Sequence, residues 1–197
     1  ATTEAIIELS EIAAEISTPL EFLDIGGGLG IKYGPSDEGL ASLEHYIQTI
    51  KSTITKYWTS HPFPKLVFEP GRYISGNCGV LITKVIRTKQ QQETNFLITD
   101  AGMNDLIRPT LYDAYHEIVP LKLNTGPESK FDIVGPICET GDFFARQRDL
   151  PPIHKNDFLA IANAGAYGRT MSSTYNSRPL TKEIIIDTDN QTIVSTD

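Results

Sequence analysis

The order of the predicted elements changes near residue 73, and this change constrains the fold more than any other feature. Before it, hydrophobic periodicity predicts helices for residues 1–16 and 39–58, and apolar runs predict short strands for 20–25 and 65–69. Each predicted strand ends in a Gly-rich or polar loop. Helix and strand in alternation are typical of a parallel α/β unit, here residues 1–73.

From Tyr73 onwards the chain consists of short β-branched or alternating runs that Gly, Pro, Asn and Asp separate. They are GVLITKVIRTKQ (79–90), NFLITDAG (95–102), YHEIVPLKL (115–123), FDIVGPI (131–137), DFLAIANAG (157–165) and KEIIIDTDNQTIVSTD (182–197). Residues 88–95, TKQQQETN, read as a polar hairpin tip. Residues 74–197 are therefore predicted to form an antiparallel β domain.

Charge and cysteine content exclude several classes of function. The net charge is −8 and no Lys/Arg cluster offsets it, which argues against a nucleic-acid-binding protein. Cys78 and Cys138 lie 60 residues apart, so they form no disulfide framework and show no metal-ligand spacing. No apolar run reaches the roughly 18 residues of a membrane span. We expect a cytoplasmic chain with free thiols.

Two loops that follow predicted strands are candidates for ligand binding. DIGGGLGI contains Gly26, Gly27 and Gly28, whose backbone amides can approach an anion closely, although a tight turn explains the pattern equally well. EPGR joins the carboxylate of Glu69 to the guanidinium of Arg72. Taken alone, it is more typical of a turn with a surface ion pair.

Three later loops carry further polar side chains. DAGMNDLIRPTLYDAYHEI places Arg108 and Tyr112 four residues apart, but Pro109 makes a regular helix there doubtful. ANAGAYGRTMSS is predicted to contain a strand end, a Gly turn and a helix N-terminus near Tyr167. GPICETGD places Cys138 beside a glutamate between glycines, an unusual setting for a structural core thiol.

The order of these five loops closely resembles the diaminopimelate decarboxylase family. These enzymes depend on pyridoxal 5′-phosphate (PLP) and combine a TIM-like barrel with a C-terminal β domain, as in alanine racemase and ornithine decarboxylase. The resemblance covers residues 20–186. It implies a fold class of α/β barrel, with only the last strands present in residues 1–73, followed by the β domain.

The resemblance implies a cofactor site and a substrate site. The phosphate of PLP would lie against Gly26, Gly27 and Gly28, and the pyridine nitrogen would face Glu69, which keeps the ring protonated as an electron sink. Gly71, Arg72 and Tyr167 would contact the phosphate and substrate. The distal carboxylate of meso-diaminopimelate would be bound by Arg72, Arg108 and Tyr112, and its distal ammonium by Glu139, with Tyr167 also near the substrate.

In this family the residue matching Cys138 returns a proton to the α-carbon after CO₂ leaves, and a thiol with an ordinary pKa near 8.5 holds that proton at pH 7. The cysteine loop reaches the partner's active site, which implies a homodimer with shared sites. Thr140 stands where the family pattern has serine, and it retains the hydroxyl.

The larger departure is the Schiff-base lysine, which lies early in the barrel of these enzymes and has no match here. Lys32 is nearest by position, and we interpret it as a solvated loop residue. A complete barrel takes about 250 residues. We therefore expect this chain to be the C-terminal part of a longer PLP-dependent carboxy-lyase, and to be inactive alone.

The sequence also allows two alternative hypotheses of function. The chain could belong to a sister decarboxylase of ornithine, arginine or carboxynorspermidine, in which aspartate typically follows the cysteine. It could also be a non-catalytic regulatory homologue, but such proteins tend to lose the cofactor contacts, whereas Gly28, Glu69, Arg72, Cys138 and Tyr167 are all present.

Overall fold

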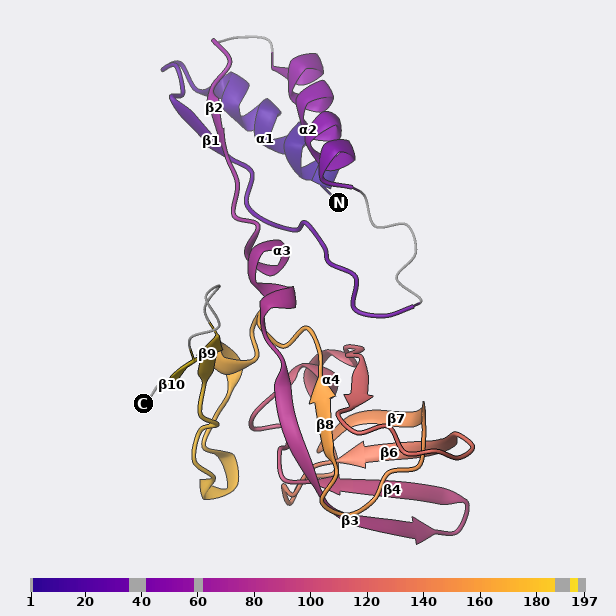
Figure 1. Ribbon diagram of the computed structural model, residues 1–197. Helices are drawn as coiled ribbons and strands as arrows, with labels where there is room; N and C mark the ends of the chain where they lie inside the picture. The colour runs from indigo at the N-terminus through magenta and orange to yellow at the C-terminus, as the bar shows by residue number, and fades with distance from the viewer. Residues whose placement is uncertain (1, 36–41, 59–61, 187–191, 195–197) are drawn as a thin grey trace. The chain divides into compact units, whose positions relative to one another are not determined.

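The computed structural model describes residues 2–35, 42–58, 62–186 and 192–194. The chain divides into two compact units, Ala1–Gly76 and Asn77–Asp197, and each is described separately below (Figure 1). No helix in the described part of the chain has the length and apolar character that crossing a membrane requires.

The first unit contains two helices and a pair of parallel strands. Its elements are α1 (Thr2–Glu15), β1 (Phe22–Asp24), α2 (Leu43–Tyr57), β2 (Lys65–Val67) and the short α3 (Gly71–Ser75). Strands β1 and β2 pair in parallel, with Leu23 opposite Leu66, as an α/β unit requires. The second helix was predicted from residue 39, but 39–41 lie outside the described residues, and α2 begins after the cap Ser42, whose Oγ accepts from the His45 amide.

A small apolar core joins the helices of the first unit to its strands. Ile6 of α1, Leu23 of β1, and Ile50 and Ile54 of α2 are all buried in one cluster. Because one helical stripe from each of α1 and α2 reaches this cluster, both helices pack on the strand pair. The core therefore fixes where β1 and β2 end, and with them the loops that follow.

The second unit is built around a six-stranded sheet of order β5-β8-β3-β4-β6-β7. Its strands are β3 (Leu81–Gln91), β4 (Thr94–Thr99), β5 (Ile118–Pro120), β6 (Ser129–Val134), β7 (Phe143–Leu150) and β8 (Phe158–Ile161). A separate antiparallel pair is formed by β9 (Ile184–Ile186) and β10 (Thr192–Val194). Figure 1 shows β3 as the long strand of this unit.

One pair in this sheet departs from the predicted antiparallel arrangement. β4 and β6 run parallel, with Leu97 opposite Ile133, whereas the other pairs described in this sheet are antiparallel. A parallel pair requires a crossover of a dozen or more residues. The chain between Thr99 and Ser129, which contains α4 (Arg108–Tyr112) and β5, is long enough to provide it.

Strand β3 extends one residue beyond the predicted run, to Gln91, and pairs with two neighbouring strands. Its first residues pair with β8 and its later residues with β4. The β3–β4 ladder extends to the pair Gln91 and Thr94, so the predicted eight-residue tip is in fact a two-residue turn, in which Gln92 has a φ of 54°. The core of the unit includes Val85, Leu97, Ile133, Phe144, Leu159 and Ile161.

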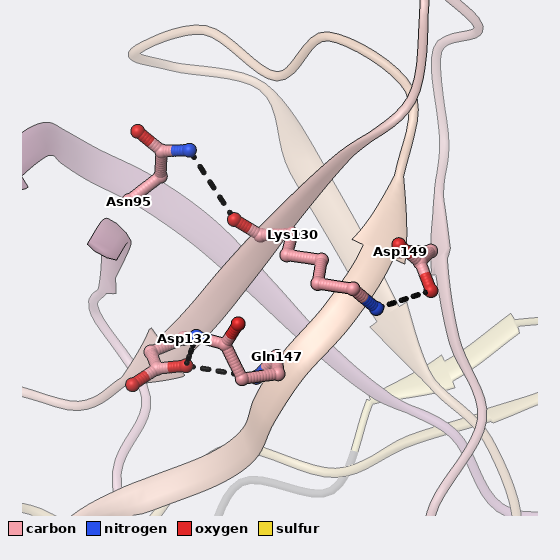
Figure 2. Close-up of polar contacts among 5 residues, drawn as sticks. All are labelled: Asn95, Lys130, Asp132, Gln147 and Asp149. Carbon is pink, nitrogen blue, oxygen red and sulfur yellow. Dashed lines mark hydrogen bonds and ion pairs between the residues drawn. The ribbon is translucent and has the colours of Figure 1, made fainter. Parts of the chain in front are cut away.

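Strand β7 was not predicted, because a β-bulge interrupts its alternation. Opposite Phe131–Ile133 of β6, the chain of β7 runs from Arg148 to Ala145, which inserts one extra residue into β7. Gln147 lies in this bulge with a φ of 49°. Its backbone N and side-chain Nε2 both donate to Oδ1 of Asp132, at 2.8 and 3.1 Å (Figure 2).

Two further polar contacts flank the bulge and join β6 to its neighbours. Asn95 Nδ2 donates to the Lys130 carbonyl at 3.3 Å, and Lys130 Nζ lies 2.9 Å from Asp149 Oδ2 (Figure 2). These contacts are exposed, so each contributes little to stability. They help to define the register of β6 between the parallel and the antiparallel partner.

Candidate active site

The two loops predicted to bind the cofactor lie next to each other in the first unit. Strands β1 and β2 are parallel, so the loops that follow them leave from the same edge. The backbone N of Glu69 donates to the Gly26 carbonyl at 2.8 Å, which joins the EPGR loop directly to the glycine loop. The first unit thus brings together the residues predicted for the cofactor from 26–28 and 69–72.

The glycine loop adopts a backbone conformation that depends on its glycines. Gly26 and Gly28 have φ angles of +73° and +98°, and a Cβ at either would meet no atom within 4 Å. At Gly27 a Cβ would lie 2.5 Å from the Glu69 carbonyl oxygen, so only glycine permits this approach. Asp24 Oδ1 accepts from the Gly26 amide, and Tyr46 OH donates to the Gly27 carbonyl. A loop fixed by these contacts, with open space beside Gly26 and Gly28, is suited to binding a phosphate group.

The EPGR loop carries two charged side chains, those of Glu69 and Arg72. Glu69 is exposed, and its carbonyl accepts from the Gly71 amide at 2.8 Å in a tight turn that leads into α3. Arg72 is the second residue of that helix and is half-buried, with its guanidinium carbon 5.9 Å from the centre of the Tyr33 ring. Lys32 lies in a loop and is exposed.

In the second unit, Arg108 lies close to both predicted tyrosines. Its guanidinium carbon is 5.7 Å from the ring centre of Tyr112 and 5.9 Å from that of Tyr167. Arg108 is only 6 % exposed, whereas the two tyrosines are 59 % and 41 % exposed. Both distances fall within the range of a cation–π contact, and two such contacts restrict where a guanidinium group can lie.

The doubt about a helix at Pro109 was misplaced. Residues Arg108–Tyr112 form α4, and Pro109 falls in its first turn, where the missing N–H costs nothing. The helix ends at Asp113, which adopts a left-handed conformation with a φ of 50°. Because residues four apart share a helix face, α4 places Arg108 and Tyr112 on the same side.

The predicted helix after Tyr167 is wrong. Tyr167 has a φ of 68°, a conformation that interrupts helical geometry, and only the 3₁₀ turn Arg169–Met171 follows it. A Cβ on Gly79 would lie 2.5 Å from the Cα of Gly165, so two backbones meet here without side chains between them. This close approach helps to set the position of the Tyr167 loop on the sheet.

The Cys138–Glu139 loop, residues 135–142, is braced by a buried carboxylate. Asp142 is 5 % exposed, and its Oδ1 and Oδ2 accept from the amides of Met103 and Ile137 at 2.7 and 2.6 Å. A Cβ on Gly135 would lie 2.5 Å from an Asp142 oxygen. Burial raises the pKa of Asp142, while the two amides act in the opposite direction. Cys138 itself is exposed, as is Glu139.

We expect Asp142→Asn to destabilise the protein by about 1–3 kcal/mol, because the new NH₂ group would face an amide donor that loses its acceptor. Asp149→Asn is the matched control, since that carboxylate is exposed in its ion pair with Lys130 and its loss should cost about 0–1 kcal/mol. Urea unfolding of the full-length protein measures both. Equal effects of the two substitutions would contradict the role of Asp142 as a brace.

Helix α4 also holds the Cys138–Glu139 loop. Thr110 Oγ1 donates to the Gly141 carbonyl at 2.5 Å, so the helix that bears Arg108 also contacts the loop that bears Cys138. The sequence pattern predicted no role for Thr110 or for Asp142. The glycines at 102 and 135, which leave room for the Asp142 carboxylate, were the available signal.

The fold and these loops correspond to a known class of enzyme. The family described as pyridoxal-dependent decarboxylase, C-terminal sheet domain, matches residues 17–165. The chain belongs to this family. The predicted fold class, the last strands of a TIM-like α/β barrel followed by an antiparallel β domain, is thereby confirmed, apart from the parallel β4–β6 pair.

Individual relatives narrow the comparison. The chain is 46 % identical to diaminopimelate decarboxylase of Zymomonas mobilis over 186 residues, which cover 94 % of this chain and 43 % of that protein. Its structure resembles diaminopimelate decarboxylase of Helicobacter pylori complexed with L-lysine (TM-score 0.85, 36 % identity, 98 % of this chain and 46 % of that one). It also resembles SrLDC in complex with PLP and cadaverine (TM-score 0.74, 27 % identity, 91 % and 46 %). The chain spans less than half the length of these relatives.

Proposed function

We propose that this chain is the C-terminal part of a PLP-dependent decarboxylase that converts meso-2,6-diaminopimelate into L-lysine. The observation that carries the proposal is the arrangement around α4. There a nearly buried Arg108 stacks beside Tyr112 and Tyr167, and Thr110 holds the Cys138–Glu139 loop. Relatives that bear the name diaminopimelate decarboxylase, at 41–46 % identity for example, support this substrate.

The residues proposed to contact the cofactor are those of the glycine loop and the EPGR loop, together with Tyr167. When bound, PLP supplies an electron sink for the carbon that loses CO₂. The backbone of Gly26, Gly27 and Gly28 would bind its phosphate, and the exposed Glu69 carboxylate would hold a proton on the ring nitrogen. Gly71, Arg72 and Tyr167 would complete the contacts with the phosphate and substrate.

The substrate contacts divide between its two ends. Arg72, Arg108 and Tyr112 would bind the distal carboxylate, for which planar guanidinium groups are suited, and Tyr167 would also touch the substrate. Glu139 would pair with the distal ammonium. Cys138 would donate its thiol proton to the carbon that has lost CO₂. We infer that the loop serves the active site of the partner subunit in a cytoplasmic homodimer, with no nucleic-acid or membrane partner.

The full-length protein tests this function. We expect an absorbance band near the visible region from bound PLP, and CO₂ release from meso-diaminopimelate in preference to ornithine, arginine and carboxynorspermidine. The isolated 197-residue chain should release none. Full-length protein that binds PLP but prefers a diamine precursor would replace the proposed substrate, and protein that binds no PLP would favour a regulatory homologue.

Glu139→Asp is expected to lower kcat/KM for meso-diaminopimelate by about 10–100-fold, because a shorter side chain withdraws a charged partner from the distal ammonium. Glu128→Asp, an equally conservative change at an exposed residue, is the matched control. Steady-state kinetics on both variants measure the effect. Unchanged kcat/KM in Glu139→Asp would remove Glu139 from the substrate site.

A further inference from the structure

A strained turn at residues 175–177 lies against the Cys138–Glu139 loop. Asn176 and Ser177 both have a φ of 58°, which lies in the left-handed region that residues other than Gly seldom adopt. Asn tolerates this region better than most residues, and such conformations persist where surrounding contacts hold them. The turn therefore needs an explanation in terms of what it contacts.

Two consecutive residues of the turn contact two consecutive residues of the loop. Asn176 Oδ1 accepts from the backbone amide of Cys138 at 3.1 Å. Tyr175 OH donates to Glu139 Oε2 at 3.5 Å, a long hydrogen bond, while Glu139 Oε1 accepts from the Thr140 amide at 2.9 Å. The turn thus reaches both residues to which the proposed function assigns chemistry.

The turn is itself anchored on both sides to residues 100–105. On one side, the Ser173 amide donates to the Asn104 carbonyl at 2.8 Å. On the other, Arg178 donates to the Asp100 carbonyl and Thr181 Oγ1 to Asp105 Oδ1 at 2.6 Å. The same segment is braced against the loop by Asp142, which accepts from the Met103 amide. Both Asp142 and the 175–177 turn therefore connect the Cys138–Glu139 loop to residues 100–105.

We propose that Asn176 is a positioning residue for Cys138, with Tyr175 in the same role for Glu139. A hydrogen bond to the Cys138 amide restricts the backbone at that residue, and this restricts the direction of its Cα–Cβ bond and of the thiol. The catalytic consequence rests on the proposed function, in which the thiol donates a proton to the substrate carbon. Small displacements of a proton donor lower the rate without altering how well the substrate binds.

Asn176→Gly isolates this hydrogen bond, because glycine keeps the left-handed backbone but removes the acceptor. In the full-length holoenzyme we expect kcat to fall about tenfold, the usual value of one hydrogen bond, with KM within about twofold of wild type. The rate at which iodoacetamide alkylates Cys138, followed by peptide mass spectrometry, should change by about threefold or more. Asn176→Asp keeps an acceptor oxygen and should restore both values.

The matched control is Asn156→Gly, which changes another left-handed asparagine, with a φ of 74°, outside the proposed site. It should leave kcat and the Cys138 alkylation rate unchanged. Wild-type values of both in Asn176→Gly would overturn the proposal.

Hydrogen exchange of the wild-type protein provides a second measurement if Asn176→Gly does not fold. The Cys138 amide should exchange more slowly than an unprotected amide, and an unprotected rate would also overturn the proposal. Wild-type protein that releases no CO₂ from diaminopimelate would refute the proposed function instead. The alkylation and exchange results would then still decide whether Asn176 positions Cys138.

Discussion

Replacing Cys138 by alanine should lower kcat for meso-diaminopimelate by about 10²–10⁴-fold, the range typical of a lost general acid. The thiol is exposed on a loop that is braced independently of it, by Asp142 and Thr110, so the substitution should leave the fold intact. Stopped assays of CO₂ release on the full-length enzyme measure the change, and KM should move little because the thiol is not assigned to substrate binding.

Cys78→Ala is the matched control for this prediction. Cys78 is also exposed and outside any disulfide, but it lies in the 3₁₀ turn Gly76–Cys78, away from the 135–142 loop in the sequence. Its replacement should leave kcat within about twofold of wild type. A Cys138→Ala enzyme with wild-type kcat would exclude the thiol as the proton donor.

Replacing Arg108 by alanine should raise KM for meso-diaminopimelate by about 30- to 5,000-fold, since losing one partner of a desolvated charge pair costs about 2–5 kcal/mol. Arg108→Lys should recover only part of this, because an ammonium group cannot reproduce the planar fork or the stacking beside Tyr112 and Tyr167. Steady-state kinetics on the full-length enzyme, with a thermal melt of each variant, measure these effects.

Arg146→Ala is the control for the loss of an arginine. Arg146 is exposed on β7, with its guanidinium carbon 4.1 Å from the centre of the Phe143 ring, so its removal deletes a similar stacking contact outside the proposed site. Its KM should match that of wild type. Equal KM values for Arg108→Ala and Arg146→Ala would remove Arg108 from the substrate site.

The local sequence pattern was sufficient to predict those parts of the structure that depend on residues close together in the chain. The parallel strands β1 and β2 follow from short apolar runs that alternate with helices, and the adjacency of the 26–30 and 69–72 loops follows from that pairing. The glycines at 26–28 were also informative, because a positive φ and a backbone contact with Glu69 both require them.

The rest depends on contacts between distant residues. In β7, a bulge interrupts the alternation of apolar and polar residues, and Asp132 of the neighbouring strand stabilises that bulge. Strand β4 pairs with β6 in parallel across a long connection. The bracing of Cys138 uses Asn176, which lies 38 residues away in the chain. Neither the partner nor the geometry of such a contact can be read from the spacing of residues in the sequence.

The parallel pairing of β4 with β6 also has a consequence for the order of folding. The β3–β4 hairpin closes over two residues and should form early, whereas β6, which can pair with β7 across the short 135–142 loop, can pair with β4 only after the whole 100–128 connection has closed. That connection contains α4, so the stacking of Arg108 beside Tyr112 and Tyr167 should appear with the last cooperative step rather than the first. We expect the amides of the β4–β6 ladder to gain protection later than those of the β3–β4 ladder during refolding.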